Sequence, residues 1–195
     1  MTPSVKILKQ EILSANWYKL YKYTYSLTDK HGKELTQSRE AYDRGNGATI
    51  LLYNKQQRTV ILTKQFRLPT FVNGNESENG MLIEACAGLL DLDNPEDCIR
   101  RETEEETGYR ISHVKKIFDV YMSPGSVTEI LYFFIGEYTR EQKVNEGGGV
   151  DEDENIEVLE YDFEKAYGMI ATGEIRDAKT IMLLQYAKLH NLFTA

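Results

Sequence analysis

The sequence predicts an α/β sandwich, a mixed β-sheet held between helices, preceded by an N-terminal antiparallel β extension. Residues 4–41 carry only strand patterns, the middle of the chain alternates apolar strands with one helix, and two helical patterns follow. A length of 195 residues suffices for one domain with a good core and a smaller appendage. We therefore expect an N-terminal β unit at residues 1–42 and the main domain at residues 43–195.

The N-terminal unit is expected to be a short antiparallel piece. Residues 17–27 are rich in Tyr, Leu and Thr, a turn follows at residues 29–32, and a second strand follows at about 34–42. A two-stranded piece is only marginally stable alone in water. We expect it to pair with something larger, either its own domain or a second copy of the chain.

The sheet of the main domain is expected to begin with a hairpin, whose two apolar strands are joined by residues 54–58. Residues 69–80 contain Asn-Gly pairs and are expected to form a loop. The run 130–135 is apolar throughout, which is typical of a strand buried on both faces. The expected strands are residues 48–53, 59–66, 81–87, 113–122, 128–138 and 156–161.

Three helices are expected, and each has a start signal in the sequence. Pro95 suits the first position of one helix, and Gly108 suits the residue just past its end. Asp162 suits the N-cap of the next helix, which ends at Gly173, and Asp177 suits the N-cap of the last. The expected helices are residues 95–107, 163–172 and 178 to about 191.

One face of the first helix carries a cluster of carboxylates. On a helical projection Glu102, Glu105 and Glu106 fall in one narrow sector, and Arg101 lies beside Glu105 at i, i+4. The three carboxylates repel each other, and they lie in the half of the helix where the macrodipole disfavours anions. A bound cation would remove these penalties, and oxygen ligands favour Mg²⁺ or Mn²⁺. The spacing alone leaves open a solvated acidic face instead.

The order of residues around this cluster resembles the Nudix hydrolase box, G-x5-E-x7-R-E-U-x-E-E-x-G-U, in which U is aliphatic. Residues 101–108, R-E-T-E-E-E-T-G, keep the half of the box that carries the metal ligands. The stretch between Gly88 and this segment is one residue short, and the first Glu of the box is missing. Thr103 and Tyr109 stand at the two aliphatic positions.

Further segments extend the resemblance over nearly the whole chain and narrow it to the Nudix branch that cleaves ADP-ribose and sugar nucleotides. Pro124, fifteen positions after Tyr109, is a mark of that branch, and the short box belongs to a subgroup that acts on GDP-mannose. The resemblance implies a Nudix fold and metal-dependent hydrolysis of a pyrophosphate bond, with GDP-mannose as the first candidate substrate and ADP-ribose or an ADP-sugar as the alternative. The segments that carry it are residues 42–48, 65–67, 72–76, 86–91, 121–125 and 172–177.

The resemblance implies roles for the residues around the box. Glu102 and Glu106 would be metal ligands, and Glu106 is also counted among the catalytic residues. Glu105 would be a ligand or a supporting residue. The backbone carbonyl of Ala87 would supply another oxygen ligand and would border the substrate.

Residues 139–155 are expected to form a loop that Gly147–Gly149 make flexible. The resemblance implies that Glu154, near the end of this loop, binds metal or acts as the catalytic base. Glu152 is the other candidate for the base, and Asp153 between them would contact the substrate. The alternative is a solvated acidic loop tip.

Substrate contacts in the main domain follow from the resemblance. Arg67 would grip the pyrophosphate, a role that suits a bidentate guanidinium. Glu129 and Lys179 would lie near the sugar and the phosphate. The alternative for Lys179 is an ordinary surface charge.

The N-terminal unit would contribute further contacts. Trp17 stands where the family places an aromatic against guanine, and the segment Ser38-Arg39-Glu40 stands where it has a basic pair before Glu, so Ser38 departs from that pattern. In the family this unit is exchanged between the two chains of a homodimer, so Trp17 and Arg39 would serve the partner's site. The alternatives are a core aromatic for Trp17 and a surface charge for Arg39.

Composition restricts the remaining possibilities. A net charge of −8 argues against nucleic-acid binding, and no segment approaches the ~18 apolar residues of a membrane span, so we expect neither partner and a cytoplasmic location. Cys86 and Cys98 are expected to be reduced packing residues. A Nudix-fold module that binds a nucleotide without turnover is the alternative from another class, and the intact Glu cluster argues against it.

Overall fold

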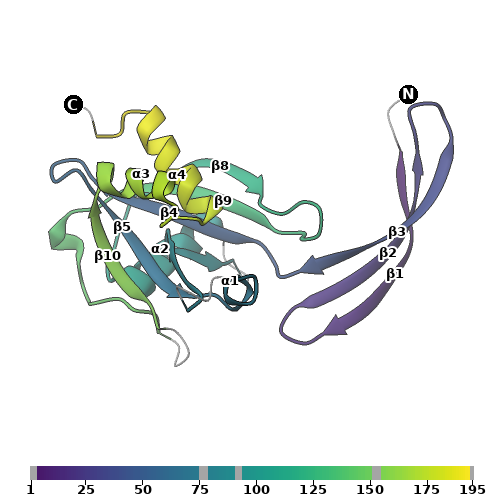
Figure 1. Cartoon of the computed structure of the whole chain (residues 1–195), viewed down its shortest axis with the longest axis horizontal. Coiled ribbons are helices and arrows are strands. Elements are labelled where there is room, and N and C mark those ends of the chain that lie inside the picture. Colours follow the sequence, from purple (N-terminus) through teal and green to yellow (C-terminus); the bar gives the residue numbers. More distant parts are fainter. Residues whose placement is uncertain (1–3, 75–78, 91–93, 151–154, 194–195) are drawn as a thin grey trace. The chain divides into compact units, whose positions relative to one another are not determined.

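The computed structural model describes residues 4–74, 79–90, 94–150 and 155–193. The chain divides into two compact units (Figure 1). The first unit contains the chain up to Asn46 together with Tyr121–Ile130, and the second contains Gly47–Val120 and the chain from Leu131 onward.

The first unit is a three-stranded antiparallel sheet in the order β1-β2-β3, formed by β1 (Val5–Ala15), β2 (Lys19–Thr28) and β3 (Glu34–Asp43). The prediction of a two-stranded piece is wrong by one strand, and the additional strand is β1. The register of β1 against β2 shifts between Ile7 and Lys9 and again between Ile12 and Ser14. Such bulges put two residues of one strand against one of its partner and hide the alternation of apolar and polar residues.

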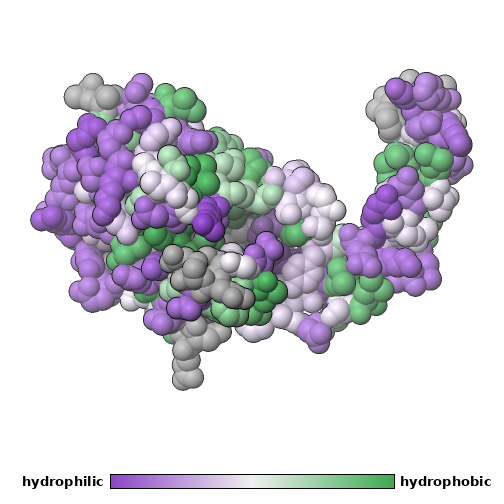
Figure 2. Space-filling model, in the orientation of Figure 1, coloured by the Kyte–Doolittle hydropathy of each residue, from purple (hydrophilic) through white to green (hydrophobic). Residues whose placement is uncertain are grey.

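The outer strand of this unit exposes apolar side chains in the single chain. Figure 2 shows apolar residues on the visible face of the unit. The exposed apolar residues of β1 and of the turn after it are Val5, Ile7, Leu8, Ile12, Leu13 and Trp17. Several large apolar side chains exposed on one strand are typical of an interaction surface.

The second unit is built on a seven-stranded mixed sheet. Its main path has the order β10-β5-β4-β9-β8, with β6 paired to β5 and β7 paired to β4. Strand β4 is parallel to β9 and antiparallel to β5, which makes the sheet mixed. The strands are β4 (Gly47–Asn54), β5 (Thr59–Phe66), β6 (Met81–Glu84), β7 (Ala87–Leu89), β8 (Lys115–Tyr121), β9 (Ile130–Glu137) and β10 (Glu157–Asp162).

Helices cover both faces of this sheet, as the sandwich prediction required. Every residue of the central strand β4 is buried, which is possible only when both of its faces are covered. Helix α2 (Pro95–Thr107) packs on β4, β5 and β7, whereas α4 (Ala178–Leu189) packs on β4 and α3 (Phe163–Thr172) packs on β5 and β10. Figure 1 shows α3 and α4 on the near side of the sheet.

In the described parts of the segments expected to be loops, two short helices are present. Helix α1 (Leu68–Val72) begins with a proline in its first turn, and a 3₁₀ turn, η2 (Arg140–Gln142), lies in the late loop. The expected strand 81–87 is two strands, β6 and β7, separated at Ala85 and Cys86, both of which are buried. None of the described helices is both long and apolar enough to cross a membrane.

Candidate active site

Helix α2 begins and ends where its sequence signals predicted. The side chain of Asn94 accepts hydrogen bonds from the backbone N–H groups of Glu96 and Asp97, and Pro95 follows it in the first turn. Gly108 ends the helix with φ +79, and its N–H donates to the carbonyl of Glu104. These two caps fix the length of the helix, and so they fix where its acidic face meets the sheet.

Glu102 and Glu106 lie against strand β7. A Cβ atom built on Gly88 would lie 2.0 Å from Cδ of Glu102, so the Glu102 side chain occupies the space that any larger residue at position 88 would need. The Glu106 carboxylate accepts from the Ala87 N–H at 3.3 Å and from the Cys86 thiol. The acidic face of α2 therefore meets the backbone of residues 86–88.

Glu106 is a buried carboxylate whose charge is poorly compensated. Only 4% of its surface is exposed, and this burial raises its pKa from 4.5 to about 7. The hydrogen bonds from Cys86 and Ala87 and the more distant Arg67 oppose that rise, while the charge of Glu102 adds to it. A divalent cation beside Glu102 and Glu106 would supply the missing compensation, so these residues fit a metal of the kind that oxygen ligands prefer.

Glu105 faces a different partner. Its carboxylate accepts from Arg101 at 3.0 Å, as the i, i+4 spacing predicted, and the same guanidinium lies 3.0 Å from Glu102. Within the ranges that the structure describes, no three His, Cys, Asp or Glu side chains are gathered closely enough to hold a metal ion. Glu102 and Glu106 therefore form an acidic pair on α2 that packs against β7, and Glu105 stands beside it in an ion pair with Arg101.

The three glycines of the late loop are fixed on α2, which corrects the expectation that they make the loop flexible. The N–H groups of Gly148 and Gly149 donate to the carbonyls of Glu106 and Glu105 at 2.9 and 3.1 Å. Gly147 has φ +70, and a Cβ there would lie 2.5 Å from the Glu106 carbonyl oxygen. Glycine is required here by a positive φ and by a close backbone approach.

This contact delivers the loop to the acidic helix face. A groove of about 570 Å³ lies between the helix and the loop, and the residues that line it are Arg101, Glu104, Glu105, Asn145, Glu146, Gly147, Gly149 and Val150. Glu152, Asp153 and Glu154, which the sequence singled out for catalysis, metal binding and substrate contact, lie outside the described residues.

Arg67 and Lys179 are brought together by a residue that sequence reasoning missed. The Glu84 carboxylate, 3% exposed, accepts from Nε of Arg67 at 2.8 Å and from Nζ of Lys179 at 2.7 Å. Asp177 lies 3.0 Å from the same Nζ. Burial opposes the charge of Lys179, but Glu84 and Asp177 outweigh it and raise its pKa above the ordinary value. Lys179 is therefore a buried cation and not the surface charge that was the alternative.

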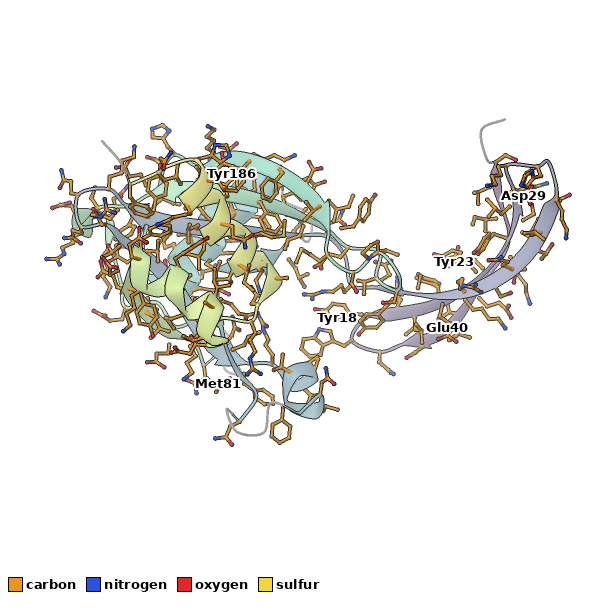
Figure 3. All side chains as sticks on the ribbon, turned by 45° about the horizontal axis from the view of Figure 1, so that its top comes forward. Tyr18, Tyr23, Asp29, Glu40, Met81 and Tyr186 are labelled. Atoms are coloured by element: carbon orange, nitrogen blue, oxygen red, sulfur yellow. The ribbon has the colours of Figure 1, made fainter. Side chains whose placement is uncertain are left out.

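The other residues with expected substrate contacts belong to the first unit. Trp17 is 80% exposed, so it is not a core aromatic of this unit in the single chain. It lines a groove of about 270 Å³ with Tyr18 and Arg44, and the guanidinium of Arg44 lies over the Tyr18 ring and 3.6 Å from Glu129. Figure 3 labels Tyr18 in this unit.

Strand β3 carries Ser38-Arg39-Glu40, the segment that stands where the resemblance implies a basic pair before Glu. Ser38 shares a hydrogen bond with Thr24 at 2.9 Å, and Arg39 donates to the carbonyl of Ser38 at 2.8 Å. Glu40, labelled in Figure 3, stands opposite Lys22 in the register of β2 and β3. These side chains are exposed, and the second unit holds Arg67 and Lys179.

Two family models match the chain. Residues 4–42 match the family model described as the GDP-mannose pyrophosphatase NudK N-terminal domain, and residues 43–184 match the NUDIX domain. The second match contains the acidic face of α2, Arg67, Glu84 and Lys179.

Curated relatives are similar over almost their whole length. The chain is 58% identical to the GDP-mannose pyrophosphatase of Yersinia enterocolitica over 192 residues, which covers 98% of this chain and 99% of that protein. It is 57% identical to the GDP-mannose pyrophosphatase of Shigella dysenteriae, with 98% and 99% covered. Among solved structures, an ADP compounds hydrolase matches with a TM-score of 0.69 at 14% identity over 95% of each chain, which supports the fold.

Proposed function

Because the chain belongs to the Nudix hydrolase family, we propose that it cleaves the pyrophosphate bond of GDP-mannose, giving GMP and mannose 1-phosphate. The observation that carries the proposal is the pair Glu102 and Glu106 packed against the backbone of residues 86–88, in a chain 58% identical to a GDP-mannose pyrophosphatase. A non-catalytic nucleotide-binding module is the weaker candidate, because binding alone has no use for a buried carboxylate that carries so little compensation.

Members of this family generally use divalent cations, and we propose Mg²⁺, with Mn²⁺ as a substitute. Glu102, Glu106 and the Ala87 carbonyl would hold the cation, with Glu105 as a further ligand or as the residue that fixes Arg101. When bound, the metal lowers the pKa of water and neutralises charge on the substrate phosphates. Glu106 would then act as a carboxylate at neutral pH, since its own pKa is about 7 without a cation.

The attacking water needs a base, and we assign that role to the acidic segment after the glycines. Glu154 is the first candidate for the base and for a metal contact, Glu152 is the second, and Asp153 would contact the substrate. Their support is the bonding of Gly148 and Gly149 to the carbonyls of α2, which brings the start of that segment to the acidic helix.

Arg67 and Lys179 would bind the pyrophosphate. The Glu84 carboxylate accepts a hydrogen bond from Nε of Arg67. In the described part of the chain, no side chain is hydrogen-bonded to the two terminal nitrogens of that guanidinium. A guanidinium in this state can form a bidentate contact with a phosphate. Lys179 donates to Glu84 and Asp177 and keeps one of its three donors for a phosphate oxygen.

We further propose that the enzyme is a homodimer that shares its sites. The support is the apolar surface of β1, which is exposed in the single chain and has the character of an interface. In the shared arrangement Trp17 would stack on the guanine of the partner's substrate, and Ser38, Arg39 and Glu40 would border its phosphates. Glu129 would lie near the sugar.

A cytoplasmic location is the accompanying proposal. Both cysteines are free and buried, as expected for packing residues in a reducing compartment. The partners would then be the nucleotide sugar and a second copy of the chain.

The test is a panel of nucleotide sugars assayed with Mg²⁺, with the products identified. GDP-mannose should have the highest kcat/KM, ahead of ADP-ribose and ADP-glucose, and should yield GMP and mannose 1-phosphate. If an adenine nucleotide has the higher kcat/KM, that nucleotide is the substrate and the assignment of GDP-mannose is wrong. Tight binding of a nucleotide sugar without turnover would favour the binding module.

A further inference from the structure

Among the residues that the structure describes, Glu84 is the most deeply buried charged residue, with 3% of its surface exposed. It is the last residue of β6, it stands opposite Thr63 in β5, and its backbone carbonyl accepts from the Thr63 hydroxyl at 3.2 Å. Its side chain therefore has a fixed origin inside the sheet. No role is assigned to it by the resemblance to the Nudix box.

Both oxygens of the Glu84 carboxylate are used, and each binds a cation from a different part of the chain. One oxygen accepts from Arg67, which directly follows β5, and the other accepts from Lys179 in the first turn of α4. Arg67 and Lys179 are 112 positions apart in the sequence (179 − 67). One carboxylate thus sets the separation of two positive side chains.

The start of α4 is fastened to the same point of the sheet. Asp177 caps the helix by accepting from the N–H and the hydroxyl of Thr180, and it also lies 3.0 Å from Nζ of Lys179. The Thr180 hydroxyl in turn accepts from the N–H of Ala85 at 2.7 Å. Lys179 is held by its backbone as well as by its two ion pairs.

Stability alone does not account for this arrangement. Removing charged groups from water is costly, and well-packed apolar residues often stabilise a fold as well as a buried ion pair does. Two cations held on one buried carboxylate, with Arg67 38% exposed at its side chain, are suited instead to receiving an anion.

We propose that Glu84 is a positioning residue that holds Arg67 and Lys179 at the spacing at which both bind the pyrophosphate of the substrate. This inference rests on the proposed function, because that function supplies the pyrophosphate. In this arrangement Glu84 acts through the two cations that its oxygens bind.

The proposal makes a prediction opposite to that of charge counting. Glu84→Gln removes one negative charge beside the anion site, and simple electrostatics would then predict tighter binding of pyrophosphate. Positioning predicts weaker binding, because an amide can accept from only one of the two cations and presents its NH₂ group to the other. We expect the affinity for inorganic pyrophosphate with Mg²⁺ to fall about ten- to a hundredfold, the range for one lost charge-assisted hydrogen bond.

The experiment measures pyrophosphate binding by calorimetry and GDP-mannose hydrolysis by steady-state kinetics on the full chain. Glu84→Asp is the second variant, because it keeps the charge and shortens the reach, so it should be impaired as well if spacing matters. Glu160→Gln is the matched control. Glu160 is a carboxylate on β10 that accepts from Tyr138 at 2.7 Å, and its amide variant should bind and turn over as the wild type does.

A double-mutant comparison separates positioning from a direct role. Because part of the effect of Glu84 passes through Arg67, Glu84→Gln should cost less affinity in an Arg67→Ala background than it does in the wild type. Full additivity of the two losses would overturn the proposal and make Glu84 an independent contact. Unchanged pyrophosphate affinity in both Glu84→Gln and Glu84→Asp would also overturn the proposal. A wild type that neither binds pyrophosphate nor cleaves a nucleotide sugar would instead refute the proposed function.

Discussion

Substitution of Gly88 tests the geometry of the acidic pair without touching a carboxylate. A Cβ at this position would lie 2.0 Å from Cδ of Glu102, and ordinary contact begins at 3.4 Å, so the Glu102 carboxylate must move by about 1.4 Å, the difference of the two distances. Misplacement by about 1 Å can cost about a hundredfold in rate. Gly88→Ala should therefore lower kcat about a hundredfold and weaken activation by Mg²⁺.

The same substitution should have a small effect on stability. Glu102 is a long side chain that can turn away, and an off-rotamer side chain costs about 0.5–1.5 kcal/mol. For a chain of this length that corresponds to a fall in Tm of a few degrees, about 2–4 °C per kcal/mol. The assay is GDP-mannose hydrolysis across a Mg²⁺ titration, beside a thermal melt.

Gly168→Ala is the control for this prediction. A Cβ at Gly168, within α3, would meet nothing within 4 Å, so alanine should be neutral or stabilise the helix by up to about 1 kcal/mol and leave the rate unchanged. Wild-type kcat and Mg²⁺ dependence in Gly88→Ala would refute the claim that Glu102 must lie over β7.

The remaining predictions concern Glu106, the acidic loop and the dimer. The pKa of Glu106 is about 7 in the folded protein and 4.5 in the unfolded chain, so the metal-free protein should lose up to about 3 kcal/mol of stability as pH rises from 4.5 to 7. Glu106→Gln should lack this loss when unfolding is measured against pH. A profile identical to that of the wild type would contradict the raised pKa. Glu152→Gln or Glu154→Gln should lower kcat far more than Tm, and wild-type rates in both would place the base elsewhere. A mixture of the Arg39→Ala and Arg67→Ala chains should have activity at about a quarter of its sites, because about half of randomly exchanged dimers are mixed and each has one intact site. No recovery of activity, or a monomer in sedimentation analysis, would refute the shared site.

Local signals predicted the bounds of α2 and the pairing of its side chains well. Pro95 and Gly108 mark its ends through caps that involve residues at most four positions away, and the i, i+4 pair of Arg101 and Glu105 is equally local. The acidic face follows from helix geometry once these ends are set. What lies under that face is less local, because the backbone of residues 86–88 belongs to a strand whose position depends on the pairing of β7 with β4.

Non-local contacts explain what the sequence did not reveal. Glu84 binds residues 17 and 95 positions away, and its only local signal is a charge at the end of the apolar run Met81–Ile83. A five-residue helix such as α1 is too short to show a period. The bulges of β1 hid its alternation.

The glycines show how composition can mislead. A run such as Gly147–Gly149 favours disorder when composition alone is considered, but all three residues have positive φ, and two of them donate to carbonyls of α2. Their conformations are set by the close approach of two backbones, which depends on tertiary contacts that no window of the sequence contains. The same composition therefore suits a flexible linker or a fixed clamp.

Metal-dependent cleavage of GDP-mannose by the wild type and by Glu106→Gln is the most direct measurement of the central claim. The wild type should release GMP and mannose 1-phosphate with Mg²⁺, lose this activity in excess chelator and regain it when Mg²⁺ or Mn²⁺ is restored. Glu106→Gln should fold normally and have a kcat lower by several orders of magnitude, about the loss expected for a group that acts directly in the reaction. Undiminished release of both products in excess chelator, or by Glu106→Gln, would contradict a mechanism built on the acidic face of α2.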